Sequence, residues 1–384
     1  MLTLVIFIVI LGMLILSHEF GHFVAAKRAG MRVDEFGFGF PPKLFGFKKG
    51  ETHYTLNLIP FGGFVKIYGE DSGPSDGNVA DEERRFVSKS KIAQGMVIIA
   101  GVTANFILAW ILFSFGFIVG LPISTSGDLA SAGMLDDVRV IVTSIAEGSP
   151  AERAGIFPGD SILLLESIRS LGTPDEAVVA SASDPKTPDE AADFITAIPK
   201  GVALRLVYMR GEEERSAVLV PEAGVIPSAP ERRAIGISMD SVGTLFLPPH
   251  KAILYGGRQT AHIAGAIAYE IVGLARDAIF GDATLENVSG PVGIYVLVEQ
   301  AGNLGFIYLV TFTALISVTL GVINLFPFPA LDGGRLLFLL IEAIKGSPMK
   351  PALVTTVNFI GFVVLIVLMI VVSYGDLVRY GFFS

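Results

Sequence analysis

The sequence of 384 residues contains no cysteine, and only 17% of its residues are charged. Without cysteine, the chain has neither a disulfide framework nor a thiol nucleophile. Hydrophobic residues make up 52% of the sequence, which excludes a disordered chain and disfavours a wholly water-soluble enzyme. The formal net charge of -9 argues against nucleic acid as a partner, because proteins that bind it present basic surfaces to the phosphates.

Four stretches almost without charge are long enough to cross a lipid bilayer, which takes roughly 20 apolar residues. They comprise residues 2–26, 92–121, 306–326 and 354–374. The first stretch has no basic region before it and no convincing small-residue cleavage site ahead of Lys27. We therefore interpret it as a retained membrane helix and not as a signal peptide.

Lysine and arginine flank these stretches unevenly, and basic flanks stay on the cytoplasmic side of a membrane. Residues 1–16 carry no basic residue, whereas basic residues follow the first stretch and precede the second. Residues 121–250 hold 19 acidic residues against 10 basic ones. This distribution predicts a cytoplasmic 27–91 segment, an extracytoplasmic 121–250 segment, and two termini that face outward.

The extracytoplasmic segment is long enough to form a domain of its own. Strands are expected at 138–145, 161–166, 202–210, 216–221 and 234–239, and a helix at 188–198 that Thr187 and Glu190 begin as a capping box. The stretch SPAERAGIFPGDSIL at 149–163 resembles the ligand-loop region of bacterial PDZ domains. The resemblance implies a PDZ-like α+β domain at 130–242 whose groove binds extracytoplasmic peptides as an added strand. The long insertion at 167–186 departs from that family, and a β-rich spacer is the alternative.

Ionisable residues occur inside the first hydrophobic stretch, in the motif HEFGH at 18–22. His18 and His22 are four residues apart, so an α-helix projects both imidazoles from one face, where they can bind a single metal ion. Glu19 is placed beside them to polarise a metal-bound water. Such groups are costly in a membrane helix and are functional by default. The alternative is a pair of structural histidines that bond neighbouring helices.

A catalytic zinc site needs a third protein ligand, and the sequence NLFPFPALDGG at 324–334 offers one. Pro327 and Pro329 interrupt a helix there, and irregular backbone at membrane depth is tolerated only around an enclosed site or a water cavity. Asp332 is the candidate ligand. A dication with two carboxylates and two neutral imidazoles sums to zero charge, which favours joining the two motifs. The alternative is a polar turn that ends a membrane helix.

These two motifs, with a PDZ-like segment between them, resemble the site-2 protease family of intramembrane metalloproteases, and within it the bacterial regulators of sigma-E type. AGVTANF at 100–106, with Val102 where the family has proline, and SGPVGI at 289–294 add to the resemblance. The resemblance implies a polytopic α-helical membrane protein with an inserted PDZ-like domain. The expected order is a first membrane helix (1–29), a cytoplasmic β-rich segment (30–91), a second membrane helix (92–121), the PDZ-like domain (130–242), an amphipathic interfacial helix (246–285), a third membrane region (286–345) and a fourth membrane helix (354–376).

The resemblance further implies a zinc ion held by His18, His22 and Asp332. It implies that Glu19 acts as the general base, taking a proton from water and passing it to the leaving amine. No covalent intermediate is needed in this chemistry. Asn324 matches a family asparagine that holds the substrate or the developing oxyanion, although helix packing explains it equally well. We also expect Asn105 to contact the substrate.

The cytoplasmic segment contains an unusually apolar stretch at 54–70, YTLNLIPFGGFVKIYGE. Two short strands around a turn at 60–63, which includes Gly62 and Gly63, are expected there. The stretch resembles the membrane-inserted β-hairpin of the family, which implies that its free edge pairs with an unwound substrate. The alternative is an ordinary soluble hairpin. The preceding 34–44 segment resembles the GFGP segment of the same family.

The resemblance implies as substrates single-pass membrane proteins, such as anti-sigma factors or signal-peptide remnants, already shortened on the outer side. The expected location is a bacterial inner membrane, with the outer domain acting as a size filter. Two other classes stay open: a non-enzymatic membrane scaffold with a PDZ groove, and a metal transporter. Both would tolerate Glu19→Gln, which separates them from a protease.

Overall fold

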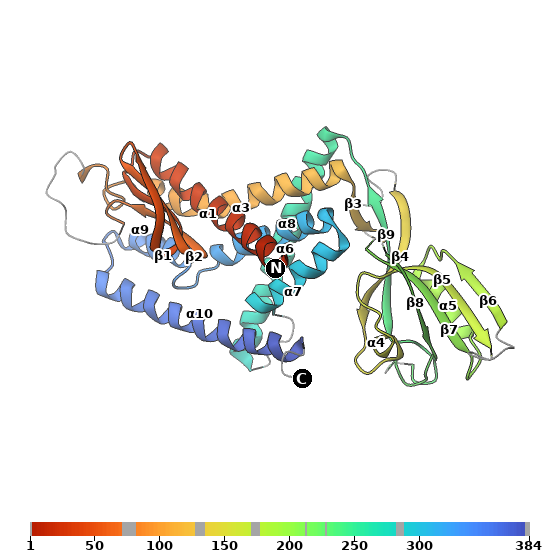
Figure 1. The fold of residues 1–384 in the computed structure, drawn as a ribbon. Coiled ribbons are helices and arrows are strands. Elements are labelled where there is room, and N and C mark those ends of the chain that lie inside the picture. Colours follow the sequence, from red (N-terminus) through yellow and green to blue (C-terminus); the bar gives the residue numbers. More distant parts are fainter. Residues whose placement is uncertain are drawn as a thin grey trace. The chain divides into compact units, whose positions relative to one another are not determined.

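The computed structural model describes residues 2–70, 82–126, 135–169, 177–211, 213–226, 229–281 and 288–380. The chain divides into two compact units (Figure 1). The helical unit comprises Met1–Ser114, Ile253–Gln300 and Leu309–Ser384, and the strand-rich unit comprises Phe115–Ala252 and Ala301–Tyr308. The chain thus enters and leaves the strand-rich unit between stretches of the helical unit, as expected for an inserted domain.

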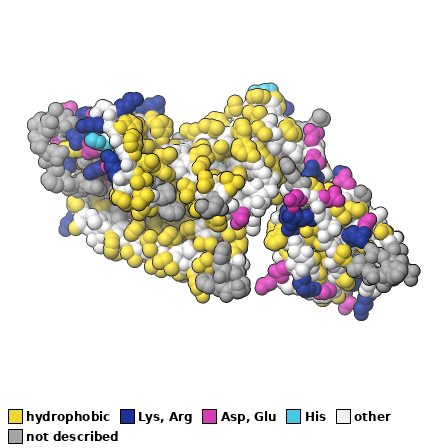
Figure 2. Space-filling model, viewed as in Figure 1, with side chains coloured by type: hydrophobic (Ala, Val, Ile, Leu, Met, Phe, Trp, Pro, Cys, Tyr) yellow, Lys and Arg dark blue, Asp and Glu magenta, His cyan; other side chains and the backbone are white. Residues whose placement is uncertain are grey.

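In the described part of the chain, four helices are long and apolar enough to cross a membrane: α1 (Leu2–Arg28), α3 (Lys91–Val119), α8 (Phe306–Leu325) and α10 (Pro351–Arg379). They coincide with the four stretches expected from the sequence, which confirms a polytopic membrane protein. Hydrophobic side chains cover much of the helical unit in the view of Figure 2. Many of them are exposed, including Phe359 at 66%, as lipid-facing side chains would be.

Helices α1 and α3 approach each other through small residues. A methyl group on Gly21 would lie 2.2 Å from the carbonyl oxygen of Ala100, and one on Gly101 would lie 2.3 Å from Nε2 of His22. The Ser17 hydroxyl donates a hydrogen bond of 3.2 Å to the Ala104 carbonyl. Small residues let membrane helices pack backbone to backbone, so the histidine-bearing part of α1 lies directly against α3.

Strands β1 (Val33–Lys49) and β2 (Thr52–Ile67) form a two-stranded sheet, called the β1–β2 sheet. Gly37 of β1 pairs with both Thr55 and Phe64 of β2, so the two halves of β2 flank the first half of β1. The two strands expected around residues 60–63 are therefore present, but each pairs with β1 rather than with the other. The second half of β2 is left at one edge of the sheet.

Among the described residues, the helical unit also holds α6 (Pro249–Phe280), α7 (Pro291–Leu304) and α9 (Asp332–Lys345). α6 corresponds to the expected amphipathic helix, and within the described chain it is not among the membrane-spanning candidates. Its interfacial position stays a prediction. α7 packs on α1, where Val298 joins a buried cluster with Phe7, Ile10 and Leu14.

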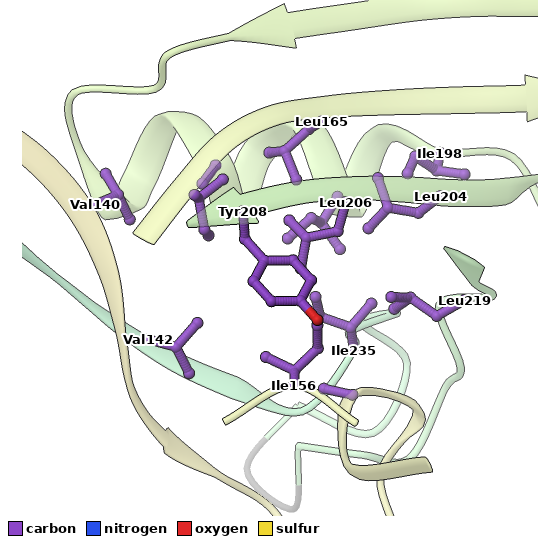
Figure 3. Close-up of a cluster of buried hydrophobic side chains, with 14 residues drawn as sticks. Val140, Val142, Ile156, Leu165, Ile198, Leu204, Leu206, Tyr208, Leu219 and Ile235 are labelled. Atoms are coloured by element: carbon purple, nitrogen blue, oxygen red, sulfur yellow. The ribbon is translucent and has the colours of Figure 1, made fainter. Parts of the chain in front are cut away.

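The strand-rich unit holds one sheet in the order β3-β9-β4-β5-β7-β8, with β6 paired to β5. The strands are β3 (Leu121–Ser124), β4 (Leu135–Ile145), β5 (Ser161–Arg169), β6 (Ala177–Ser183), β7 (Ala203–Arg210), β8 (Glu213–Leu219) and β9 (Ile237–Leu245), and the helices are α4 (Pro150–Arg153) and α5 (Pro188–Ala197). Thr187 accepts a hydrogen bond from the Glu190 amide at the start of α5, as the capping box predicts. Tyr208, Leu165 and Leu206 lie in the core (Figure 3).

Five strands and the helix of this unit are confirmed, with shifted ends. β3 and β6 were not expected, because β3 has only four residues, and in β6 two adjacent valines followed by alanine and serine give no alternating hydrophobic pattern. β6 lies inside the 167–186 insertion, of which residues 170–176 lie outside the described chain. The unit is an α+β domain, and its PDZ-like character stays a prediction.

Candidate active site

The two histidines of the HEFGH motif lie one helical turn apart on α1 with their rings nearly perpendicular. Nε2 of His18 and Nε2 of His22 are 3.2 Å apart, and the ring planes meet at 83°. The side chains are only 13% and 12% exposed. The spacing of four residues therefore brings both imidazoles to one point, as the sequence predicts.

Asp332 reaches the same point from more than 300 residues further along the chain. Its Oδ2 lies 3.0 Å from Nε2 of His18 and 3.2 Å from Nε2 of His22. Asp332 is the first residue of α9 and its side chain is 14% exposed. The structure thus joins the two motifs that the sequence separates.

The turn between α8 and α9 places Asp332, and glycine is required in it. Methyl groups on Gly333 and Gly334 would lie 2.2 Å from the Phe326 carbonyl oxygen and 2.3 Å from that of Phe328. α9 therefore starts directly against the preceding turn. Ala330 has a left-handed backbone with φ of 72°, which is costly for a residue with a Cβ.

The far nitrogen of each imidazole also has a partner. Nδ1 of His22 lies 2.8 Å from the Val97 carbonyl oxygen on α3. Because a carbonyl only accepts, Nδ1 carries the proton, and in the neutral imidazole the lone pair then lies on Nε2, the nitrogen nearest Asp332. Nδ1 of His18 lies 3.3 Å from Nδ2 of Asn105. α3 thus orients both rings.

The three side chains fit a zinc ion. Their donor atoms all lie within 4.8 Å of one another, and Oδ2 of Asp332 is buried without a hydrogen-bond partner. Zinc prefers imidazole nitrogen and carboxylate oxygen at about 2.0–2.2 Å in a tetrahedron, which separates ligand atoms by roughly 3.3 Å. The observed separations of 3.0 and 3.2 Å agree with that spacing.

Glu19 and the edge of the sheet enclose a cavity of about 200 Å³ next to this cluster. Gly63 lies so close that a methyl group on it would be 3.0 Å from Cγ of Glu19. Glu70 and Arg335 also line the cavity and form an ion pair of 2.5 Å. The cavity is large enough to hold water beside Glu19.

The other candidate residues occupy different places. Asn105 is fully buried and contacts His18, and Gly62 has a positive φ of 115° with Phe40 against it. Asn324 is half-buried near the end of α8 and is not among the side chains that line this cavity. A substrate contact by any of the three stays a prediction.

Sequence reasoning missed Glu70, Arg335 and the Val97 carbonyl. Arg335 follows directly after the Asp332-Gly-Gly turn, so its proximity to the cluster could have been noticed. Glu70 follows the apolar strand that lines the cavity. A backbone carbonyl such as that of Val97 leaves no signal in a sequence, because every residue has one.

Membrane-spanning helices around an enclosed histidine, glutamate and aspartate cluster define a membrane-embedded metallopeptidase. Residues 6–368 match the model of peptidase family M50. The chain is 30% identical to zinc metalloprotease RasP of Geobacillus kaustophilus, with 98% of each chain covered. It is also 30% identical to RasP of Oceanobacillus iheyensis, over 99% of each chain, and of Bacillus licheniformis, over 98% of this chain and 99% of the relative.

The chain belongs to peptidase family M50, and it is an intramembrane zinc metalloprotease. The zinc cofactor implied by these relatives agrees with the His-His-Asp cluster. The family match runs through both units and covers all four membrane-spanning candidates, except for the ends of the first and last.

Proposed function

We propose that His18, His22 and Asp332 hold the catalytic zinc ion and that Glu19 is the general base. The observation that carries this assignment is the convergence of one Asp332 oxygen on both Nε2 atoms, within 3.2 Å. When bound, zinc supplies a Lewis acid that polarises the scissile carbonyl and acidifies water. The Glu19 carboxylate takes the proton of the attacking water and donates it to the amine nitrogen that leaves.

Neighbouring residues on α3 and α8 hold the imidazoles of His18 and His22 in the protonation state that metal binding requires. His22 donates from Nδ1 to the Val97 carbonyl, which selects the neutral tautomer whose Nε2 lone pair can bind metal. The Asn105 amide reaches His18, and its Oδ1 is buried without a partner. A half-turn of this amide presents Oδ1 to Nδ1–H of His18, so that Nε2 of His18 is also free to bind metal. Ser317 donates to the Asn105 carbonyl at 2.8 Å and fixes this position on α3.

The edge of the β1–β2 sheet is the surface for an unwound substrate. Gly63, Phe64 and Val65 belong to the half of β2 at the sheet edge, and all three line the Glu19 cavity. A helix that opens in lipid loses its backbone hydrogen bonds and needs replacement partners. Strand addition at this edge supplies them and brings the scissile peptide next to Glu19.

Single-pass membrane proteins with a shortened outer part, of the anti-sigma-factor or signal-peptide type, are the proposed substrates. The distribution of basic residues supports a bacterial inner membrane with the strand-rich unit on the outer side. There the unit acts as a size filter and, through its PDZ-like groove, binds extracytoplasmic peptides. Cleavage of a model substrate with and without its ectodomain tests the filter, and equal rates would contradict it.

The zinc assignment is tested by purifying the wild-type protein and Glu19→Gln in detergent and measuring zinc content and cleavage of a membrane-spanning peptide. The expected result is full zinc retention by Glu19→Gln with cleavage nearly abolished. Unchanged cleavage by this variant would contradict the proposed role of Glu19. Zinc absent from the active wild-type enzyme would contradict the metal site.

A further inference from the structure

Helix α10 contributes no residue to the active-site cavity, yet two of its contacts join it to other parts of the helical unit. Only three of its 29 residues are buried: Gly361, Val372 and Asp376. At 100° per residue, these three and Asn358 lie within about 60° of one another around the helix. α10 therefore attaches through one narrow stripe, with its other faces exposed.

The first contact fixes the turn that carries Asp332. Oδ1 of Asn358 accepts a hydrogen bond of 3.2 Å from the Ala330 amide. Gly361 lies against Pro329, where a methyl group on it would be 2.5 Å from the proline Cβ. Ala330 is also the residue with the left-handed backbone, φ of 72°, which needs support from its surroundings to persist.

The second contact lies 18 residues further along α10, about 27 Å at 1.5 Å per residue. Asp376 is 1% exposed, and its Oδ2 accepts hydrogen bonds from the amides of Gly290, at 2.9 Å, and Gly293, at 2.8 Å. Methyl groups on these glycines would lie 3.0 and 2.9 Å from the carboxylate oxygens. The carboxylate thus caps the start of α7, where unpaired amides attract negative charge.

We propose that α10 is a positioning helix for the metal site, in which Asn358 and Gly361 fix the turn before Asp332 while Asp376 anchors the helix to α7. Apolar surfaces give little association energy in lipid, so polar contacts and small-residue packing determine where a membrane helix sits. α10 is long, apolar and largely exposed, so polar contacts such as these two contribute strongly to its position. The inference rests on the proposed role of Asp332 as a zinc ligand.

The test measures the rate at which a chelator removes zinc from purified protein. Asn358→Ala, which lacks the acceptor, is expected to lose zinc about 10- to 100-fold faster than the wild type, the range seen when outer contacts of metal ligands are removed. Asn358→Asp keeps the acceptor oxygen and should restore slow release. Ile360→Ala is the matched control, because Ile360 is 56% exposed and lies on another face of the same helix.

A second pair of variants tests the anchor. Asp376→Leu removes both acceptor oxygens and is expected to accelerate zinc release, whereas Asp376→Asn keeps one oxygen for the two glycine amides and should stay close to the wild type. Release from Asn358→Ala and Asp376→Leu at the rate of Ile360→Ala would overturn the proposal. Asp332→Ala is measured in parallel. Slow release from that variant would instead overturn the ligand assignment.

Cross-linking in native membranes tests the first contact without purification, in case a variant fails to fold. The chain has no cysteine, so Pro329→Cys combined with Gly361→Cys introduces the only two thiols. Their Cβ atoms would start 2.5 Å apart and reach the 3.5–4.5 Å of a disulfide after a shift of about 1 Å. Oxidation is expected to form an intramolecular disulfide, detected by a mobility shift that reductant reverses. Pro329→Cys with Ile360→Cys is the control pair and should form much less intramolecular disulfide. Equal yields from the two pairs would contradict the contact.

Discussion

Gly101 of α3 faces the imidazole of His22 so closely that a methyl group on it would lie 2.3 Å from Nε2. The space between the Gly101 backbone and the His22 ring is therefore too small for any side-chain atom. The absence of a side chain at this position therefore sets how near α3 comes to the metal site. It also allows the neighbouring Val97 carbonyl to accept from Nδ1 of His22 at 2.8 Å.

Gly101→Ala is expected to displace His22 or to separate α1 from α3. Overpacking of this kind costs about 1–3 kcal/mol, and we expect peptide cleavage to fall at least 10-fold together with zinc affinity. Gly95→Ala is the matched control on the same helix, since a methyl group there would be 3.6 Å from its nearest neighbour. Equal zinc affinity and activity in the two variants would contradict the close approach.

Glu19→Gln removes the proposed proton acceptor while keeping the side-chain shape. General-base catalysis contributes about 10²- to 10⁴-fold, so kcat should fall by that factor. KM and zinc content should change little, because the three proposed ligands are intact. Steady-state cleavage of a membrane-spanning peptide, with metal analysis of the same preparation, measures both. A loss of zinc equal to the loss of activity would point to a ligand instead of a base.

Gly63→Val should narrow the cavity beside Glu19. A Cβ at this position would lie 2.7 Å from Cγ2 of Ile15 and 3.0 Å from Cγ of Glu19, and valine adds two methyl groups to it. We expect cleavage to fall by about 10-fold or more from overpacking of 1–3 kcal/mol, with zinc retained. Slow chelator release of zinc from a poorly active variant would show that the zinc ligands are undisturbed and that the loss arises at Glu19 or at the substrate. If Gly63→Val instead kept the wild-type kcat/KM, the substrate would not bind at the β2 edge next to Gly63.

Glu51, in the turn between β1 and β2, gives a pH-dependent contribution to stability. Hydrogen bonds from Arg84 and Lys27 lower the pKa of Glu51 to about 2. Since the folded-state pKa lies below the unfolded value of about 4.3, the stabilisation is fully present above pH 4.3 and is lost as the pH falls toward 2. The side chain is 31% exposed, so the effect should be about 1 kcal/mol or less.

Thermal unfolding of the wild type and Glu51→Gln should therefore differ at pH 7 and converge as the pH approaches 2. The matched comparison is Glu213→Gln, because Glu213 pairs with Arg215 on an exposed strand and should contribute little. A difference between wild type and Glu51→Gln that grows on acidification would contradict the assigned ion pairs.

The spans and the paired motifs could be predicted from the sequence because their signals are local. A charge-poor run of about 20 residues and two histidines four apart need no knowledge of the rest of the chain. Joining Asp332 to His18 required a further argument, from charge balance in a low-dielectric surround. The structure confirms that juxtaposition to within 3.2 Å.

Contacts that depend on close tertiary approach could not be predicted. The pairing of both halves of β2 with β1, and the bond between Asn358 and Ala330, each join residues whose side chains or backbones are unremarkable in the sequence. Gly101 was noted only as part of a motif, and its contact with His22 emerges once α1 and α3 are packed. Such contacts follow from shape complementarity in three dimensions, which residue spacing does not encode.

The most direct test of the central claim is the zinc content of the purified protein compared with Asp332→Ala, prepared identically in detergent. If two remote segments build one metal site, the wild type carries one equivalent of zinc and the variant loses most of it while its helical content is unchanged by circular dichroism. A variant that retains a full equivalent of tightly held zinc would contradict the account.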